Sequence, residues 1–277
     1  MKYSFCTWTY SSGTTWLPVY PIEETLRRIA AKGYDAAELV CAAPHAWPDF
    51  MTPEKIKSLR KAYEDNKLAC SSIFLHPGGG SGYNACSFDE IERDCCVTTH
   101  KKVIDIAYEL ECPTLLYIAG WYGYGVSRKQ AWQWSMDGLN QIADYAGEKG
   151  MIVCVEPTAS ASNLVENGED ALQMMEESGR ENVYTMLDIE HVLYRKEVPV
   201  DSVYRMGKTL RHIHLTDDKR IPPGCGPTDF LHIIQALKDI GYPGYLTVEA
   251  GFDNSMSPDD VARVSIEYLK SVEKKLV

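Results

Sequence analysis

Four side chains that can ligate a metal ion each stand at the end of a short apolar run. They are Glu156, Asp188, His214 and Glu249, and the runs before them cover residues 151–155, 182–187, 210–213 and 245–248. A short apolar run bounded by polar or turn residues is typical of a buried β-strand. Three carboxylates and one imidazole suit a hard or borderline divalent cation. The pattern therefore predicts one divalent metal ion, with Mn²⁺ favoured and Mg²⁺, Co²⁺ or Zn²⁺ as alternatives.

These four residues need a fold that brings strand ends together. Apolar segments alternate with segments of helical periodicity along the chain. The expected strands cover residues 3–8, 35–40, 68–74, 113–118, 151–156, 182–188, 210–215 and 244–249. Steps of roughly 30 residues without a break in composition favour a closed (β/α)₈ TIM barrel, one domain over residues 1–277, rather than an open doubly wound sheet. The active site of such a barrel lies at the C-terminal face of the strands, where the four side chains would meet.

Any one of the four could be an ordinary polar strand end. As a set they favour a site, because unpaired charges at a barrel mouth repel one another and are costly to bury. The charged and Gly/Pro-rich residues 216–226 predict a loop over this face. Glycines 78–80 predict a second loop there, since the lysine of a phosphate-binding motif does not follow them.

The composition limits the partners. Hydrophobic residues make up 45% of the chain and charged residues 24%, which allows a full core. The formal net charge of −11 argues against nucleic acid and against an anionic membrane surface, since both attract clustered Lys and Arg. No apolar run reaches the ~20 residues of a membrane span, and we expect no secretory signal. Nine cysteines without a C-x-x-C pair favour reduced thiols and a cytoplasmic location.

Several motifs surround the four residues. They are Glu156-Pro157, Asp188-Ile189-Glu190-His191, His212-Ile213-His214 with Arg220, and Glu249. Together they resemble the xylose-isomerase-like barrels and, within them, the ketose 3-epimerases that act on D-tagatose or D-allulose. The chain is more similar to the fructoselysine 3-epimerase type. That likeness rests on Gly33-Tyr34-Asp35, Pro44-His45-Ala46, Ser162-Asn163-Leu164-Val165 and Leu210-Arg211-His212-Ile213-His214.

The resemblance implies a role for each residue. The metal ligands would be Glu156, Asp188, His214 and Glu249. Glu156 and Glu249 would also form an acid/base pair on opposite faces of a sugar, and His191 and Arg220 would contact its oxygens. The chemistry is consistent, because a cation bound to a ketone and the adjacent hydroxyl stabilises an enediolate. Two carboxylates can then remove the C3 proton from one face and return one to the other, so we expect inversion of C3 in a ketose or ketose conjugate.

Other positions allow two interpretations. Arg220 could instead be a solvated loop cation, and His191 a histidine satisfied at a helix start. His45 is expected either to line the substrate pocket or to anchor its loop. Trp121 belongs to an aromatic group at the end of the fourth strand, and such rings stack on the C–H faces of sugars. Glu38 ends the second strand as either a support for the metal site or a structural acid.

One position departs from the free-ketose 3-epimerases. Those enzymes have a second glutamate six residues after the ligand on the fifth strand, where this chain has Ser162. The departure implies a substrate that carries an extra group. Whether the sugar is free, phosphorylated or attached to an amine stays open, because one arginine does not define a phosphate site.

Alternative functions use the same fold. An aldose–ketose isomerase or an inosose-dehydratase-like lyase would share the metal and the first proton abstraction. An endonuclease-IV-like phosphodiesterase would need more histidines than the seven present and a basic groove. A non-enzymatic sugar-binding protein is the remaining class. The resemblance also implies a homo-oligomer, either a dimer or a tetramer.

Overall fold

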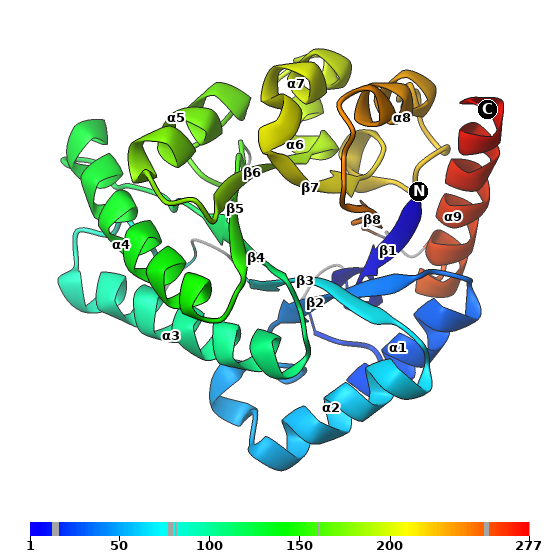
Figure 1. Ribbon diagram of the computed structural model, residues 1–277, viewed down its shortest axis with the longest axis horizontal. Coiled ribbons are helices and arrows are strands. Elements are labelled where there is room, and N and C mark those ends of the chain that lie inside the picture. Colours follow the sequence, from blue (N-terminus) through cyan, green and yellow to red (C-terminus); the bar gives the residue numbers. More distant parts are fainter. Residues whose placement is uncertain (13–16, 77–79, 81, 160, 252–254, 277) are drawn as a thin grey trace.

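A computed structural model describes residues 1–12, 17–76, 80, 82–159, 161–251 and 255–276. Parallel strands close into a barrel in the order β1 to β8, with β8 paired to β1 (Figure 1). They are β1 (Lys2–Cys6), β2 (Ala36–Cys41), β3 (Ala69–Leu75), β4 (Thr114–Ile118), β5 (Ile152–Glu156), β6 (Val183–Asp188), β7 (Leu210–Leu215) and β8 (Tyr245–Val248). The predicted TIM barrel is confirmed. Of the expected loop over 78–80, Gly78 and Gly79 lie outside the described residues.

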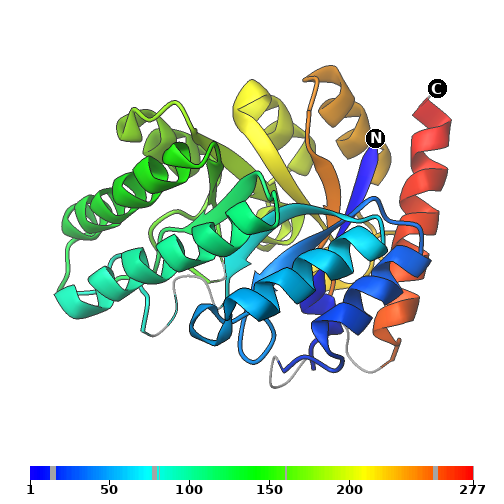
Figure 2. The same cartoon turned by 60° about the horizontal axis from the view of Figure 1, so that its bottom comes forward.

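Helices follow the strands and form a ring outside the barrel, as Figures 1 and 2 show from two directions. They are α1 (Ile22–Ala31), α2 (Pro53–Asp65), α3 (Glu90–Glu109), α4 (Arg128–Glu148), α5 (Gly168–Ser178), α6 (Ile189–Tyr194), α7 (Pro199–Met206), α8 (Phe230–Asp239) and α9 (Pro258–Glu273). The sequence did not predict α6, a short helix directly after β6. Within the described ranges, no helix has both the length and the apolar character to cross a membrane.

Side-chain caps fix where many of these helices begin. Residues that accept a hydrogen bond from a backbone N–H of the first turn are Thr52, Asp89, Ser127, Asn167 and Ser257. Such caps satisfy N–H groups that have no partner inside the helix. Asp188 caps α6 in the same way, because its Oδ1 accepts from the Glu190 N–H at 2.8 Å. The other oxygen of Asp188, Oδ2, lies at the C-terminal face and accepts from Arg220 Nη2 at 2.8 Å.

The strand register brings three of the expected site residues to one level. The Cα partner of Asp188 on β7 is His214, and the partner of His214 on β8 is Thr247. Glu249 follows β8 directly, and its N–H donates to the carbonyl of Leu215 at 3.3 Å. Asp188, His214 and Glu249 are therefore neighbours at the C-terminal end of consecutive strands.

Polar side chains are buried inside the barrel beneath this end. Ser4 Oγ lies 2.7 Å from Ser71 Oγ, and Ser71 Oγ lies 3.3 Å from Ser72 Oγ. Ser72 donates to Glu38 Oε2 at 2.6 Å, and Glu38 is fully buried. TIM-barrel interiors are usually filled by layers of branched apolar side chains. The polar row leads from β1 across β3 to β2 and ends at a carboxylate that faces the expected metal ligands.

Candidate metal centre

The imidazole of His214 joins the buried interior to the C-terminal face. Its Nε2 lies 2.9 Å from Glu38 Oε1 and 3.1 Å from Glu38 Oε2. Its Nδ1 is buried and has no hydrogen-bond partner among the described residues. A carboxylate can only accept, so Nε2 carries the proton of that contact and Nδ1 is the nitrogen left to bind a further group.

Three carboxylate oxygens surround the unpartnered Nδ1 of His214. Glu249 Oε2 lies 3.2 Å away, Asp188 Oδ2 3.9 Å and Glu156 Oε1 4.0 Å. Atoms bound to one cation at about 2.0–2.2 Å stand about 3–4 Å apart, which matches these separations. The donor set therefore fits a divalent cation bound by Glu156, Asp188, His214 and Glu249.

Two overlapping groups of possible ligand atoms describe the same region. One consists of Asp188, His214 and Glu249, and the other of Glu156, Asp188 and His191; within each group the atoms lie within 4.8 Å of one another. Asp188 is common to both groups. All five side chains are buried. Carboxylates packed this closely repel one another unless positive charge compensates them, and Arg220 supplies part of that charge at Asp188 and Glu249.

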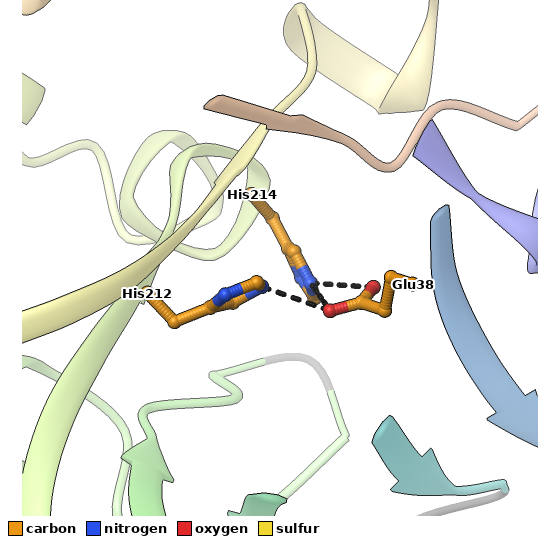
Figure 3. A group of neighbouring side chains, drawn as sticks. All are labelled: Glu38, His212 and His214. Atoms are coloured by element: carbon orange, nitrogen blue, oxygen red, sulfur yellow. Dashed lines mark hydrogen bonds and ion pairs between the residues drawn. The ribbon is translucent and has the colours of Figure 1, made fainter. Parts of the chain in front are cut away.

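Glu38 supports His214 from below, as Figure 3 shows. His212 Nε2 also lies 2.8 Å from Glu38 Oε2, at an angle that makes no hydrogen bond. Burial alone would raise the pKa of Glu38, but the imidazoles of His214 and His212 outweigh it and hold the pKa well below its usual range. A metal-ligating histidine commonly donates its other N–H to a carboxylate, which fixes the ring and its tautomer. The expectation that Glu38 ends the second strand is wrong, because Glu38 is the third residue of β2 and points into the barrel interior. Of the two roles expected for Glu38, the contact supports the one at the metal site.

Arg220 lies against the same carboxylates. Its Nη2 is 2.8 Å from Asp188 Oδ2, its Nη1 is ion-paired with Glu249, and only 24% of its side chain is exposed. Burial would raise the pKa of Asp188, but Arg220 outweighs it and holds the pKa well below its usual range. His191 Nε2 lies 3.6 Å from Asp188 Oδ2 and 3.9 Å from Glu156 Oε1. The structure thus brings two of the four expected substrate-binding side chains, Arg220 and His191, beside the candidate ligands.

Asp217 organises the loop that carries Arg220, a role that the sequence analysis missed. Its carboxylate accepts from the backbone N–H groups of residues 218, 224, 226 and 228 and from the Thr228 hydroxyl, at 2.5–3.3 Å. A Cβ at Gly226 would meet Asp217 Oδ1 at 2.5 Å, so only glycine allows this approach. The sequence signal that could have indicated this role of Asp217 is the pair of glycines at 224 and 226, a few residues after the end of a buried strand.

The remaining two expected substrate-binding residues lie further out. His45 Nε2 is 2.7 Å from the carbonyl oxygen of Tyr20, and His45 lines a cavity of about 440 Å³ with Tyr20, Met51 and Lys55. Burial lowers the pKa of His45. Trp121 follows β4 and is 51% exposed. Neither residue belongs to the groups of possible ligand atoms found among the described residues.

The buried carboxylate of Glu156 has a pKa suited to proton transfer near neutrality. Burial raises this pKa to about 8, because the charged form loses its hydration and His214 compensates only in part. A general acid or base works best when its pKa lies near the working pH. The arrangement therefore offers a cation-binding set, and in the metal-free protein it contains a carboxyl group that can hold a proton.

Comparisons with known proteins found similar sequences and similar folds. A family model described as xylose isomerase-like TIM barrel matches residues 26–272. Fructoselysine 3-epimerase of Shigella flexneri is 29% identical over 262 residues, which cover 91% of this chain and 93% of that protein. D-psicose 3-epimerase of Agrobacterium fabrum is 25% identical over 230 residues, covering 81% and 77%. The solved structure of D-psicose 3-epimerase from Clostridium cellulolyticum H10 with D-tagatose has a TM-score of 0.87, 18% identity and coverage of 98% and 99%.

Proposed function

The chain belongs to the xylose isomerase-like TIM barrel family, and from this premise we propose that it is a divalent-metal-dependent epimerase that inverts C3 of a ketose or ketose conjugate. The observation that carries the proposal is the unpartnered Nδ1 of His214 with carboxylates on three sides. Two of these carboxylates, Glu156 and Glu249, come from strand ends three strands apart around the barrel. Relatives that are named 3-epimerases support the same assignment.

Glu156, Asp188, His214 and Glu249 would hold the cation, with Mn²⁺ favoured. When bound, it supplies Lewis-acid stabilisation of negative charge on the substrate's oxygens. The protein's contribution is to fix the ligand positions. Glu38 orients His214, and the α6 N–H of Glu190 holds one oxygen of Asp188.

Proton transfer would use the two glutamates on opposite faces of the sugar. The Glu249 carboxylate, ion-paired with Arg220, accepts the C3 proton, and the electron pair of that C–H bond moves into the C2 carbonyl. Glu156, which lies three strands away around the barrel, supplies a proton to the other face of C3. The reverse reaction exchanges the two roles. One C–H bond breaks and one forms, so no redox cofactor is needed.

The remaining expected residues would bind and orient the substrate. Arg220 donates hydrogen bonds as a fixed cation, and His191 acts as a neutral imidazole because burial lowers its pKa. Trp121 would present its exposed ring to the sugar beyond the reacting carbons. His45, whose Nε2 is bonded to Tyr20, would contact the substrate only beyond the reacting carbons, since the residues that line its cavity include none of the candidate ligands.

The test is a substrate panel run with metal-free protein, with and without added Mn²⁺. Free ketoses, ketose phosphates and fructosamines are incubated, and the products are identified by NMR. We expect a C3 epimer to form only with added metal. His214→Ala should remove both bound metal and activity, whereas the exposed His232→Gln should keep both.

The products also separate the alternatives. An aldose would indicate an aldose–ketose isomerase, and loss of water would indicate a lyase. If no member of the panel changes although Mn²⁺ is bound, the enzymatic assignment fails.

A further inference from the structure

The loop after β4 lies beside the candidate metal centre. Ile118, the last residue of β4, is the register partner of Glu156 on β5. Gly120, Trp121 and Tyr122 follow at the C-terminal face, before α4 begins. This loop therefore borders the space that a substrate held at Glu156 would enter.

Two asparagines hold this loop. Each one binds both the backbone N–H and the backbone carbonyl of a single loop residue. Asn84, from the loop between β3 and α3, accepts from the Trp121 N–H at 3.1 Å and donates to the Trp121 carbonyl at 2.6 Å. Asn163, from the loop between β5 and α5, accepts from the Tyr122 N–H at 2.9 Å and donates to the Tyr122 carbonyl at 3.0 Å. A primary amide offers a donor and an acceptor side by side, which suits this paired arrangement.

The residue before them is held as well. Ser162 donates to the Gly120 carbonyl at 2.7 Å and accepts from the Leu164 N–H at 3.2 Å. Gly120 has a φ of +99°, and a Cβ there would lie 2.2 Å from Asn84 Oδ1. Glycine is thus required for the Asn84 amide to reach the backbone. Three consecutive residues are fixed by side chains from the loops on both sides.

We propose that Asn84 and Asn163 are positioning residues that hold Trp121 and Tyr122 as a preformed wall for the part of the substrate beyond C4. The inference rests on the proposed epimerase function and adds to it the device that sets chain-length preference. Trp121 is 51% exposed although four hydrogen bonds fix its backbone and that of Tyr122. An exposed ring on a fixed backbone binds a ligand without a further cost of ordering the loop. The Ser162 hydroxyl donates its hydrogen bond to the Gly120 carbonyl and therefore has no hydrogen left to donate to the substrate. The contacts of this wall with the substrate are therefore made by the aromatic rings of Trp121 and Tyr122.

The first experiment compares a short substrate with a long one. Erythrulose, the four-carbon ketose with a C3 stereocentre, ends before the wall. Fructoselysine reaches it through C5 and C6 of its sugar, while its lysine is attached to C1 on the other side of C3. Asn84→Ala and Asn163→Ala should each lower kcat/KM for fructoselysine about tenfold through KM, the size expected when roughly one ordered segment must be fixed on binding. Erythrulose should change less than twofold. Asn66→Ala, which removes a similar half-buried amide at the C-terminus of α2, should change neither.

A double-mutant cycle separates positioning from general damage. In a Trp121→Ala background, Asn84→Ala should cause little further loss with fructoselysine, because the ring that Asn84 positions is gone. Equal losses for both substrates, or full additivity with Trp121→Ala, would overturn the inference.

A second measurement needs no substrate. In protein labelled with 5-fluorotryptophan, the ¹⁹F signal of Trp121 is identified by its absence in Trp121→Phe. It should be one sharp line in the wild type and should broaden or split in Asn84→Ala but not in Asn66→Ala. An unchanged line would refute the positioning role even if the protein acted on no ketose. A broadened line together with an inactive wild type would refute the epimerase assignment alone.

Discussion

The imidazole of His214 and the carboxylate of Glu38 meet across the barrel interior, with Nε2 of the histidine 2.9 Å from Oε1 of the glutamate. Their strands, β7 and β2, are not neighbours in the barrel. Because the Glu38 carboxylate accepts a hydrogen bond from Nε2–H, Nδ1 is the ring nitrogen that faces Glu156, Asp188 and Glu249. This contact decides which histidine nitrogen can bind a cation.

Replacing Glu38 should therefore weaken metal binding although it is not a ligand. Glu38→Gln keeps the size of the side chain but loses the charge that holds the N–H of His214. We expect a 10–100-fold weaker affinity for Mn²⁺, the usual cost of removing such a support, measured by isothermal titration calorimetry. Glu64→Gln, on the outer face of α2, is the matched control and should bind as the wild type does. Equal affinities for Glu38→Gln and the wild type would refute the role of this contact.

Substrate preference follows from Ser162. Its hydroxyl donates to the Gly120 carbonyl, so it adds no charged contact to a sugar. We expect a ketose conjugate such as fructoselysine to be used with a higher kcat/KM than D-fructose, D-tagatose or D-allulose. Side-by-side kinetics with one enzyme preparation measure this. A higher kcat/KM for a free ketose than for fructoselysine would contradict this prediction without affecting the proposed metal site.

A buried histidine far from the mechanism predicts acid sensitivity of the fold. Burial lowers the pKa of His100, and its Nδ1 lies 2.8 Å from the carbonyl of Cys96. Below about pH 6.5 His100 becomes protonated in the unfolded chain but stays neutral in the folded chain. The free energy of unfolding therefore falls as the pH is lowered. His100→Gln should lose less stability than the wild type between pH 7.5 and 5.5.

Urea unfolding in the presence of EDTA measures this difference without the contribution of bound metal. His232→Gln, which replaces an exposed histidine, is the control and should follow the wild type. If His100→Gln loses as much stability between pH 7.5 and 5.5 as the wild type does, His100 is not a source of the acid sensitivity.

The barrel could be predicted because its signals are local. Apolar runs followed by Glu156, Asp188, His214 and Glu249 mark four strand ends, and topology carries such ends to one face. The bounds of the short helix α6 were not predicted, although a helix start at His191 was one of the two interpretations of that residue, and its cap by Asp188 was missed. Six residues give too little periodicity to indicate a helix.

The supports of the site depend on contacts between segments that are distant in sequence. Glu38 meets His214 across 176 residues, and Asn84 meets Trp121 across 37. No spacing rule connects such pairs, because each depends on strand register and loop course. The pattern of strand ends could therefore indicate the expected ligands. It could not indicate Glu38, which supports His214, or Asn84, which fixes the loop after β4.

The central claim is that Glu156 and Glu249 exchange the proton on C3. Substituting either by Gln removes a proton carrier and should cost on the order of 10²–10⁴-fold in rate, provided that metal content is unchanged. Loss of one glutamate should still permit C3 exchange from one epimer while net epimerisation stops.

The most direct measurement is turnover of the best ketose substrate in deuterated water, with the product read by NMR. Epimerisation by the two glutamates predicts deuterium at C3 of the product and none at C1. Deuterium at C1 with an unlabelled C3 would contradict it and identify an aldose–ketose isomerase.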